Sequence, residues 1–151
     1  MSKFDTIIFD LGGVVLDIDF NRADEAFYQL PAHTTERKRL AELFTFTAQD
    51  PFFTEFEVGN ITAPEFRVGL CERLSLNVLD HDLDQAWNAI LVDLPLERIE
   101  LIKELRKDHQ VLLFSNTNEL HQNNFEEMFK HKLSGGSIHD LFDHVLSLIH
   151  I

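Results

Sequence analysis

The sequence predicts an α/β fold in which a Rossmann-like parallel sheet is interrupted by an inserted α-helical cap. Two short apolar runs, residues 6–10 and 110–114, are typical of buried parallel strands, and polar residues follow each of them. Between them, residues 21–92 contain stretches with apolar side chains at three- and four-residue spacing, as in amphipathic helices. We therefore expect a core of residues 1–20 and 93–151 and a helical cap of residues 21–92.

The first strand leads Asp10 into a turn that contains Gly12 and Gly13. Glycine allows a tight turn and lets the backbone approach a ligand closely. Because open α/β sheets bind ligands at the carboxyl ends of their strands, Asp10 is a candidate nucleophile or metal ligand. Residues 14–20 then alternate apolar and acidic side chains, which indicates a short extended flap.

The inserted segment is expected to be helical. Five phenylalanines crowd residues 44–56, and we interpret them as core packing and not as a ligand box, because aromatic residues are commonly buried. They are Phe44, Phe46, Phe52, Phe53 and Phe56. The predicted helices are Ala23 to Leu30, Thr35 to Phe46, Ala63 to Leu76 and Asp82 to Leu91.

The α/β pattern returns near Pro95, which favours the start of a helix that runs to about Asp108. The second strand ends in Ser115-Asn116-Thr117-Asn118, another helix spans residues 119–133, and a third strand begins near Phe142. Taken alone, the polar tetrapeptide is typical of a helix N-cap. Beside Asp10 at a neighbouring strand end, it is favoured as a ligand-binding loop.

The composition of the chain restricts the classes of partner that it could bind. The chain has 151 residues and a formal net charge of −13, which opposes binding to nucleic acid. The single cysteine, Cys71, excludes an internal disulfide and lacks metal-site spacing. The only apolar stretch near the N-terminus is too short and too acidic for a signal peptide or a membrane span. We expect a cytoplasmic protein without a membrane partner, while the sequence leaves its oligomeric state open.

Two motifs carry a family resemblance. Residues 9–14, Phe-Asp-Leu-Gly-Gly-Val, resemble the first motif of the haloacid dehalogenase (HAD) superfamily, and residues 113–118 resemble the second. Residues 10–22 are similar to the branch of sugar-phosphate phosphatases that act on compounds such as glucose 1-phosphate, and residues 56–66 resemble a cap signature of that branch. The resemblance implies a phosphatase of a small phosphorylated metabolite.

The same resemblance implies roles for single residues. Asp10 would attack phosphorus to form an aspartyl-phosphate, and would hold Mg²⁺ together with the backbone carbonyl of Gly12. The Ser115 hydroxyl and the Asn116 N–H would bind the phosphoryl oxygens, near the start of a helix, where anions are favoured.

One departure from the family pattern concerns proton transfer. The common phosphatase motif has a second aspartate, the general acid and base, where this chain has Gly12. Such help contributes about 10²- to 10⁴-fold. Asp17, Asp19 and His121 are possible substitutes, or else they are two solvated flap carboxylates and a residue of the first helical turn.

A second departure concerns the C-terminal part. The family uses a lysine after the third core strand and an acidic pair after the fourth, and the sequence ends before either. Lys130 and Lys132 lie about 20 Å along a helix that rises ~1.5 Å per residue, too far to replace the lysine. The last six residues, 146–151, resemble a translated sequencing adapter, although an apolar strand is the alternative. We expect an inactive N-terminal fragment with a truncated core, whose first strand is an open, aggregation-prone edge.

Two other functions stay open. Asp10 could displace halide from carbon without a metal, as dehalogenase relatives do. The protein could also be a non-catalytic module that binds phosphate or metal, as Gly12 and the absent lysine and acidic pair would allow.

Overall fold

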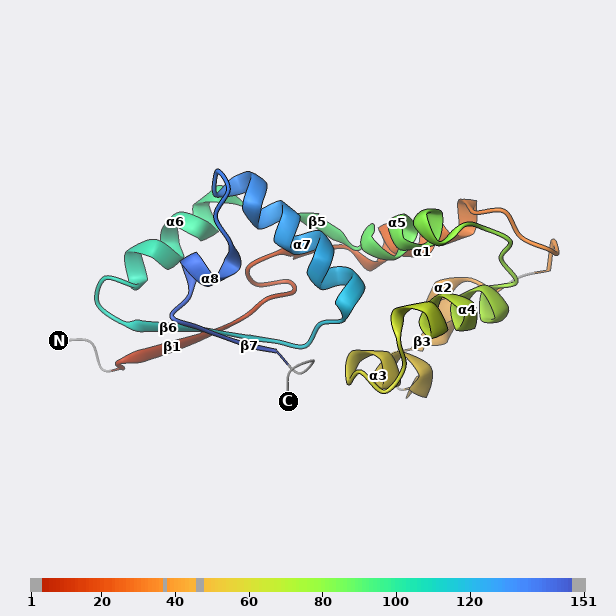
Figure 1. Cartoon of the computed structure of the whole chain (residues 1–151), viewed down its shortest axis with the longest axis horizontal. Coiled ribbons are helices and arrows are strands. Elements are labelled where there is room, and N and C mark those ends of the chain that lie inside the picture. Colours follow the sequence, from red (N-terminus) through yellow and green to blue (C-terminus); the bar gives the residue numbers. More distant parts are fainter. Residues whose placement is uncertain (1–3, 37, 46–47, 148–151) are drawn as a thin grey trace. The chain divides into compact units, whose positions relative to one another are not determined.

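The computed structural model describes residues 4–36, 38–45 and 48–147 (Figure 1). They divide into two compact units. Unit 1 comprises Met1–Ile18, Leu91–Thr117 and Gln122–Ile151, and unit 2 comprises Asp19–Ile90 and Asn118–His121. Unit 2 therefore contains most of the segment expected to be a cap, together with a four-residue piece of a later helix.

Unit 1 is built on a parallel sheet, which confirms the predicted α/β class. Its strands β1 (Thr6–Asp10), β6 (Gln110–Ser115) and β7 (His144–Ser147) lie in the order β1-β6-β7. The register pairs Asp10 with Phe114 and Phe114 with Leu146. The carboxyl ends of all three strands consequently meet at one edge of the sheet.

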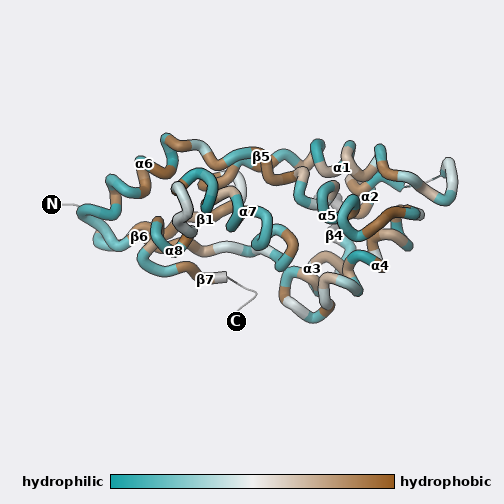
Figure 2. The backbone as a smooth tube through the Cα atoms, turned by 45° about the horizontal axis from the view of Figure 1, so that its top comes forward, coloured by the Kyte–Doolittle hydropathy of each residue, from teal (hydrophilic) through white to brown (hydrophobic). Residues whose placement is uncertain are grey.

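Helices cover one face of this sheet (Figure 1). They are α6 (Leu96–Leu105), α8 (Ile138–Leu141) and the part of α7 (Glu119–Lys132) that belongs to unit 1. Apolar and polar residues are interspersed along α6 (Figure 2). Ile99 and Ile102 are buried in the same apolar cluster as the sheet residues Val111 and Leu113. Helix α8 was not predicted; its capping box joins Ser137 and Asp140, three residues apart.

The opposite face of the sheet carries exposed apolar side chains. Ile8 is 66% exposed, Phe114 43% and Leu146 49%, and the register places these residues on neighbouring strands. Alternation along a strand explains the difference between the faces, because successive side chains point to opposite sides.

A short antiparallel ribbon completes unit 1. Strand β2 (Asp17–Ile18) pairs with β5 (Leu91–Asp93), and Asp17 lies opposite Asp93. Cations neutralise both carboxylates: Arg98 lies 2.7 Å from Asp17, and Lys132 lies 2.8 Å from Asp93. Of the predicted flap, residues 17–18 are a strand and the preceding residues form a turn.

Unit 2 packs its helices around an aromatic core. Phe53, Phe56, Phe66 and Trp87 are buried together, and Phe52 packs against them. The interpretation of Phe53 and Phe56 as core residues is confirmed, whereas Phe46 and the side chain of Phe44 lie outside what the structure describes. The helices are α1 (Phe20–Gln29), α2 (Leu40–Leu43), α3 (Pro51–Glu57), α4 (Ala63–Leu74) and α5 (Asp80–Asn88), and β3 (Phe44–Thr45) pairs with β4 (Ala48–Gln49).

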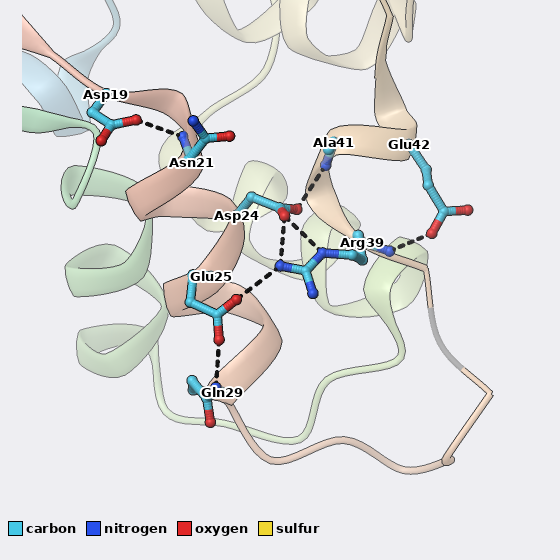
Figure 3. A network of polar contacts seen from close by, with 8 residues as sticks. All are labelled: Asp19, Asn21, Asp24, Glu25, Gln29, Arg39, Ala41 and Glu42. Atoms are coloured by element: carbon cyan, nitrogen blue, oxygen red, sulfur yellow. Dashed lines mark hydrogen bonds and ion pairs between the residues drawn. The ribbon is translucent and has the colours of Figure 1, made fainter.

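The predicted helix from Thr35 to Phe46 is wrong, because among its described residues only 40–43 are helical. The Asp24 carboxylate explains where α2 begins: it accepts a hydrogen bond from the Ala41 N–H at 2.9 Å and one from Arg39 Nε at 2.7 Å (Figure 3). The Glu42 carboxylate accepts the Arg39 N–H. These side chains satisfy backbone donors that a longer helix would have used.

Candidate active site

Asp10 is the last residue of β1 and is exposed at the carboxyl edge of the sheet. Its Oδ1 accepts a hydrogen bond of 2.7 Å from the backbone N–H of Leu11. This bond orients the carboxylate and leaves Oδ2 as the oxygen for attack or for a metal.

The turn after Asp10 is held by backbone hydrogen bonds. The Leu11 carbonyl accepts from the N–H groups of Val15 and Leu16, both at 2.9 Å, and the Leu16 carbonyl accepts from Gly13 at 2.8 Å. Gly13 has φ 75°, a conformation that favours glycine. Gly12 has an ordinary backbone, and a Cβ there would only touch Ile18 at 3.6 Å. Because Leu11 and Leu16 supply the carbonyls that close the turn, the Gly12 carbonyl is left for a ligand.

Ser115 and Asn116 lie at the end of the neighbouring strand. Ser115 is the last residue of β6, one position beyond the Phe114 that pairs with Asp10, and it is buried. Asn116 is exposed, and Thr117 is buried. The structure thus brings Asp10, Gly12, Ser115 and Asn116 to one edge of unit 1, as expected for parallel neighbours.

Asn118 begins helix α7. Its Oδ1 accepts a hydrogen bond of 3.0 Å from the backbone N–H of His121, the third residue of α7. This is the bond that an N-cap makes. The tetrapeptide therefore contains an N-cap at its last residue, which leaves its first two residues for the ligand-binding role.

The three possible acid–base substitutes are all engaged elsewhere. Asp17 pairs with Arg98, which also donates to the Val15 carbonyl at 3.4 Å. Asp19 is the N-cap of α1 and accepts the Asn21 N–H at 3.0 Å. These contacts favour the structural interpretation of both carboxylates.

The surroundings of His121 favour a neutral imidazole. Its ring stacks on Trp87 at a centroid distance of 4.9 Å, and its Nδ1 lies 3.0 Å from Asn88 Oδ1. Burial lowers the pKa of His121 from 6.5 to about 3. An imidazole with this pKa lacks the imidazolium proton that a general acid would donate near neutral pH.

The partners of His121 were not predictable from the sequence pattern. Trp87 and Asn88 lie at the end of α5, where apolar periodicity indicates only core packing. Asn118 before a helix predicts an N-cap bond to the backbone of the third helical residue, His121, but no local signal predicts the contacts of its ring.

The residues present fit part of a magnesium site. Mg²⁺ prefers oxygen ligands, and one carboxylate oxygen of Asp10 and the Gly12 carbonyl are two such donors on one turn. Within residues 4–36, 38–45 and 48–147 there is no group of three or more His, Cys, Asp or Glu side chains that could hold a metal. Lys130 and Lys132 are paired with Glu127 and Asp93, respectively.

None of the helices in the part of the chain that the structure describes has both the length and the apolar character needed to cross a membrane.

Comparisons with known proteins find a phosphatase among the relatives of this chain. No protein-family model matches the sequence. The D-ribitol-5-phosphate phosphatase of Bacteroides thetaiotaomicron is 35% identical over 112 residues, which cover 74% of this chain and 52% of the relative. The chain thus spans about half the length of that curated relative.

Solved structures match over nearly the whole chain. A HAD family enzyme of Bacteroides thetaiotaomicron, crystallised as an aspartate-to-alanine mutant with magnesium and inorganic phosphate, is 30% identical with a TM-score of 0.84. The match covers 97% of this chain and 70% of that enzyme. A predicted HAD-like hydrolase of Porphyromonas gingivalis, 22% identical, shares the fold with a TM-score of 0.79 over 99% of this chain and 68% of its own. A parallel sheet that ends in Asp10 and Ser115, together with this similarity to the Bacteroides enzyme, shows that the chain belongs to the haloacid dehalogenase family.

Proposed function

We propose that the protein is a Mg²⁺-dependent phosphatase that hydrolyses a small phosphorylated metabolite, a sugar or polyol phosphate, through Asp10. The observation that carries the proposal is the position of Asp10 at the carboxyl end of β1, beside the Ser115-Asn116 loop that ends β6. The similarity to a D-ribitol-5-phosphate phosphatase and to an enzyme crystallised with magnesium and phosphate supports the substrate class and the metal.

The chemistry assigned to this chain begins with Asp10. The Leu11 N–H holds Oδ1, so Oδ2 attacks phosphorus and the bond from phosphorus to the substrate oxygen breaks. Water then hydrolyses the aspartyl-phosphate and releases inorganic phosphate. The Ser115 hydroxyl and the Asn116 N–H bind phosphoryl oxygens through both steps. A bound Mg²⁺, held by Asp10 and the Gly12 carbonyl, would neutralise the charge of the carboxylate and the phosphate.

The proton for the departing oxygen has no side-chain donor among the three candidates. Asp17, Asp19 and His121 are each held by other contacts, and His121 is neutral. We infer that water supplies this proton, which predicts a turnover about 10²- to 10⁴-fold below that of a phosphatase with a positioned general acid.

The test compares Asp10→Asn with Asp5→Asn, an exposed aspartate just before β1. In the protein expressed from its complete reading frame, phosphate release from ribitol 5-phosphate or glucose 1-phosphate should require Mg²⁺. Asp10→Asn should lower kcat by at least about 10³-fold, as loss of a nucleophile does in other enzymes. Asp5→Asn should leave it within about twofold, the effect of an ordinary surface change.

The alternative functions have their own outcomes. Chloride release from a 2-chloroalkanoate without Mg²⁺ would indicate a dehalogenase. Binding of Mg²⁺ or orthovanadate without turnover of any phosphate ester would indicate a non-catalytic module. We further propose that the 151-residue chain by itself lacks turnover, which a parallel assay of that chain tests.

A further inference from the structure

Four side chains of unit 2 fasten the end of α5 to the first turn of α7. Trp87 Nε1 donates a hydrogen bond of 3.3 Å to Asn118 Oδ1, the same oxygen that accepts the His121 N–H. The His121 ring stacks on the Trp87 indole with an interplanar angle of 4°, and His121 Nδ1 bonds Asn88. Trp87 is 8% exposed and Asn118 only 3%, so both groups of the Trp87–Asn118 bond are shielded from water. We call Trp87, Asn88, Asn118 and His121 the tryptophan clamp.

The tryptophan clamp holds a residue that adjoins the candidate phosphate loop. Asn118 belongs to unit 2, whereas Ser115, Asn116 and Thr117 belong to unit 1. Only Thr117 separates the Asn116 N–H from the clamped Asn118. Consecutive Cα atoms are about 3.8 Å apart, and only one residue lies between Asn118 and Asn116. A displacement of Asn118 by an ångström should therefore also move the backbone of Asn116.

We propose that Trp87 is a positioning residue for the phosphate loop, acting through its hydrogen bond to Asn118, and that its indole senses whether phosphate occupies that loop. The inference rests on the proposed function, because it assigns phosphate to Ser115 and Asn116. It adds a residue of α5, about thirty positions away in sequence, to the determinants of phosphate affinity.

A purely structural role for Trp87 is the alternative. The indole also contacts the aromatic core, at centroid distances of 4.9 Å from Phe66 and 5.9 Å from Phe53. A variant that lost only packing would lower the melting temperature and leave phosphate affinity unchanged. The test therefore needs variants that remove the bond to Asn118 and keep most of the packing.

Two variants meet this requirement. Trp87→Phe retains an aromatic ring and loses the indole N–H. Asn118→Ser retains an N-cap residue of a favoured type, but its shorter side chain no longer reaches Trp87. Phe53→Leu is the matched control, since it removes an aromatic neighbour of Trp87 that makes no hydrogen bond to Asn118.

The kinetic readout separates binding from chemistry. In the protein from the complete reading frame, Trp87→Phe and Asn118→Ser should each weaken competitive inhibition by inorganic phosphate and raise KM about 2- to 12-fold, the range for one hydrogen bond, with a smaller change in kcat. Phe53→Leu should lower the melting temperature and leave both constants within twofold. Equal constants in wild type and in whichever of the two variants folds would overturn the proposal.

The spectroscopic readout uses the fact that Trp87 is the single tryptophan of the chain. Phosphate added with Mg²⁺ should change its fluorescence with the same midpoint as the inhibition of turnover. The response should persist in Phe53→Leu and weaken in Asn118→Ser. Phosphate that inhibits turnover without a fluorescence change would overturn the sensing role alone, whereas a wild type that neither hydrolyses phosphate esters nor binds phosphate would overturn the proposed function as well.

Discussion

Single residues around the candidate site differ in whether they are committed to other contacts. Asp10 Oδ2 and the Gly12 carbonyl are left for ligands by the bonds that fix the turn, whereas Asp17, Asp19 and His121 serve an ion pair, an N-cap and a ring stack. The protonation of His121 follows from its surroundings. Burial lowers the pKa of His121 to about 3, although a histidine in an unfolded chain titrates near ~6.5.

This pKa difference predicts a pH dependence of stability. Between pH 6.5 and about 3 the unfolded state binds a proton at His121 that the folded state does not bind. The free energy of unfolding should therefore fall as the pH is lowered through this window, by up to about 1.4 kcal/mol per pH unit from this group. His121→Phe, which keeps a ring against Trp87, should flatten the slope between pH 6.5 and 5, where carboxylates titrate little.

Denaturant unfolding at several pH values measures this slope. His81→Gln is the control, because His81 is exposed on α5 and has no comparable burial. Equal slopes for wild type and His121→Phe in this interval would contradict a neutral His121.

At the scale of elements, helix α4 depends on the absence of a side chain at Gly69. A Cβ there would clash with Cε2 of the Phe52 ring. That ring cannot easily move away, because Phe66 stacks on it at 5.0 Å and the Arg73 guanidinium lies 3.9 Å from its centre. Arg73 is in turn held to Asp50, the N-cap of α3, at 3.0 Å. Gly69 thus permits the contact between α3 and α4.

We predict that Gly69→Ala destabilises unit 2. Alanine improves helix propensity by about 1 kcal/mol, but overpacking costs about 1–3 kcal/mol. The free energy of unfolding should therefore fall by about 1 kcal/mol. Thermal unfolding measures the change, and Val68→Ala, an exposed change in the same helix, should not lower stability. Replacing Phe52 by Leu should restore room, so a double variant more stable than the sum of its single changes would confirm the cause.

At the scale of the whole molecule, two features have opposite effects on the association of chains in solution. The sheet exposes Ile8, Phe114 and Leu146 on one face, and β1 is an edge strand in the sheet order of the described chain. Such surfaces pair with other chains. The net charge of −13 keeps the copies apart.

We predict that the 151-residue chain self-associates, and more strongly as salt is added. Salt shortens the Debye length from about 30 Å at 0.01 M to about 10 Å at 0.1 M, which weakens repulsion and leaves apolar attraction. Sedimentation velocity should show larger species at higher salt, and Ile8→Thr with Phe114→Gln should return the chain towards monomer. A monomer with a sharp two-state thermal transition at every salt concentration would refute this prediction.

The sequence by itself determined the strands that carry Asp10 and Ser115, the turn at Gly12 and Gly13, and most of the helices, because apolar periodicity and glycine act over a few neighbouring residues. The tertiary structure alone decided which polar groups remain available. Asp24 sets the start of α2 from seventeen residues before Ala41, Arg98 of α6 pairs with Asp17 of β2, and Trp87 reaches Asn118 from another helix. These contacts join residues distant along the chain, and their formation depends on which segments the folded backbone brings within hydrogen-bonding distance, a property that no local pattern contains.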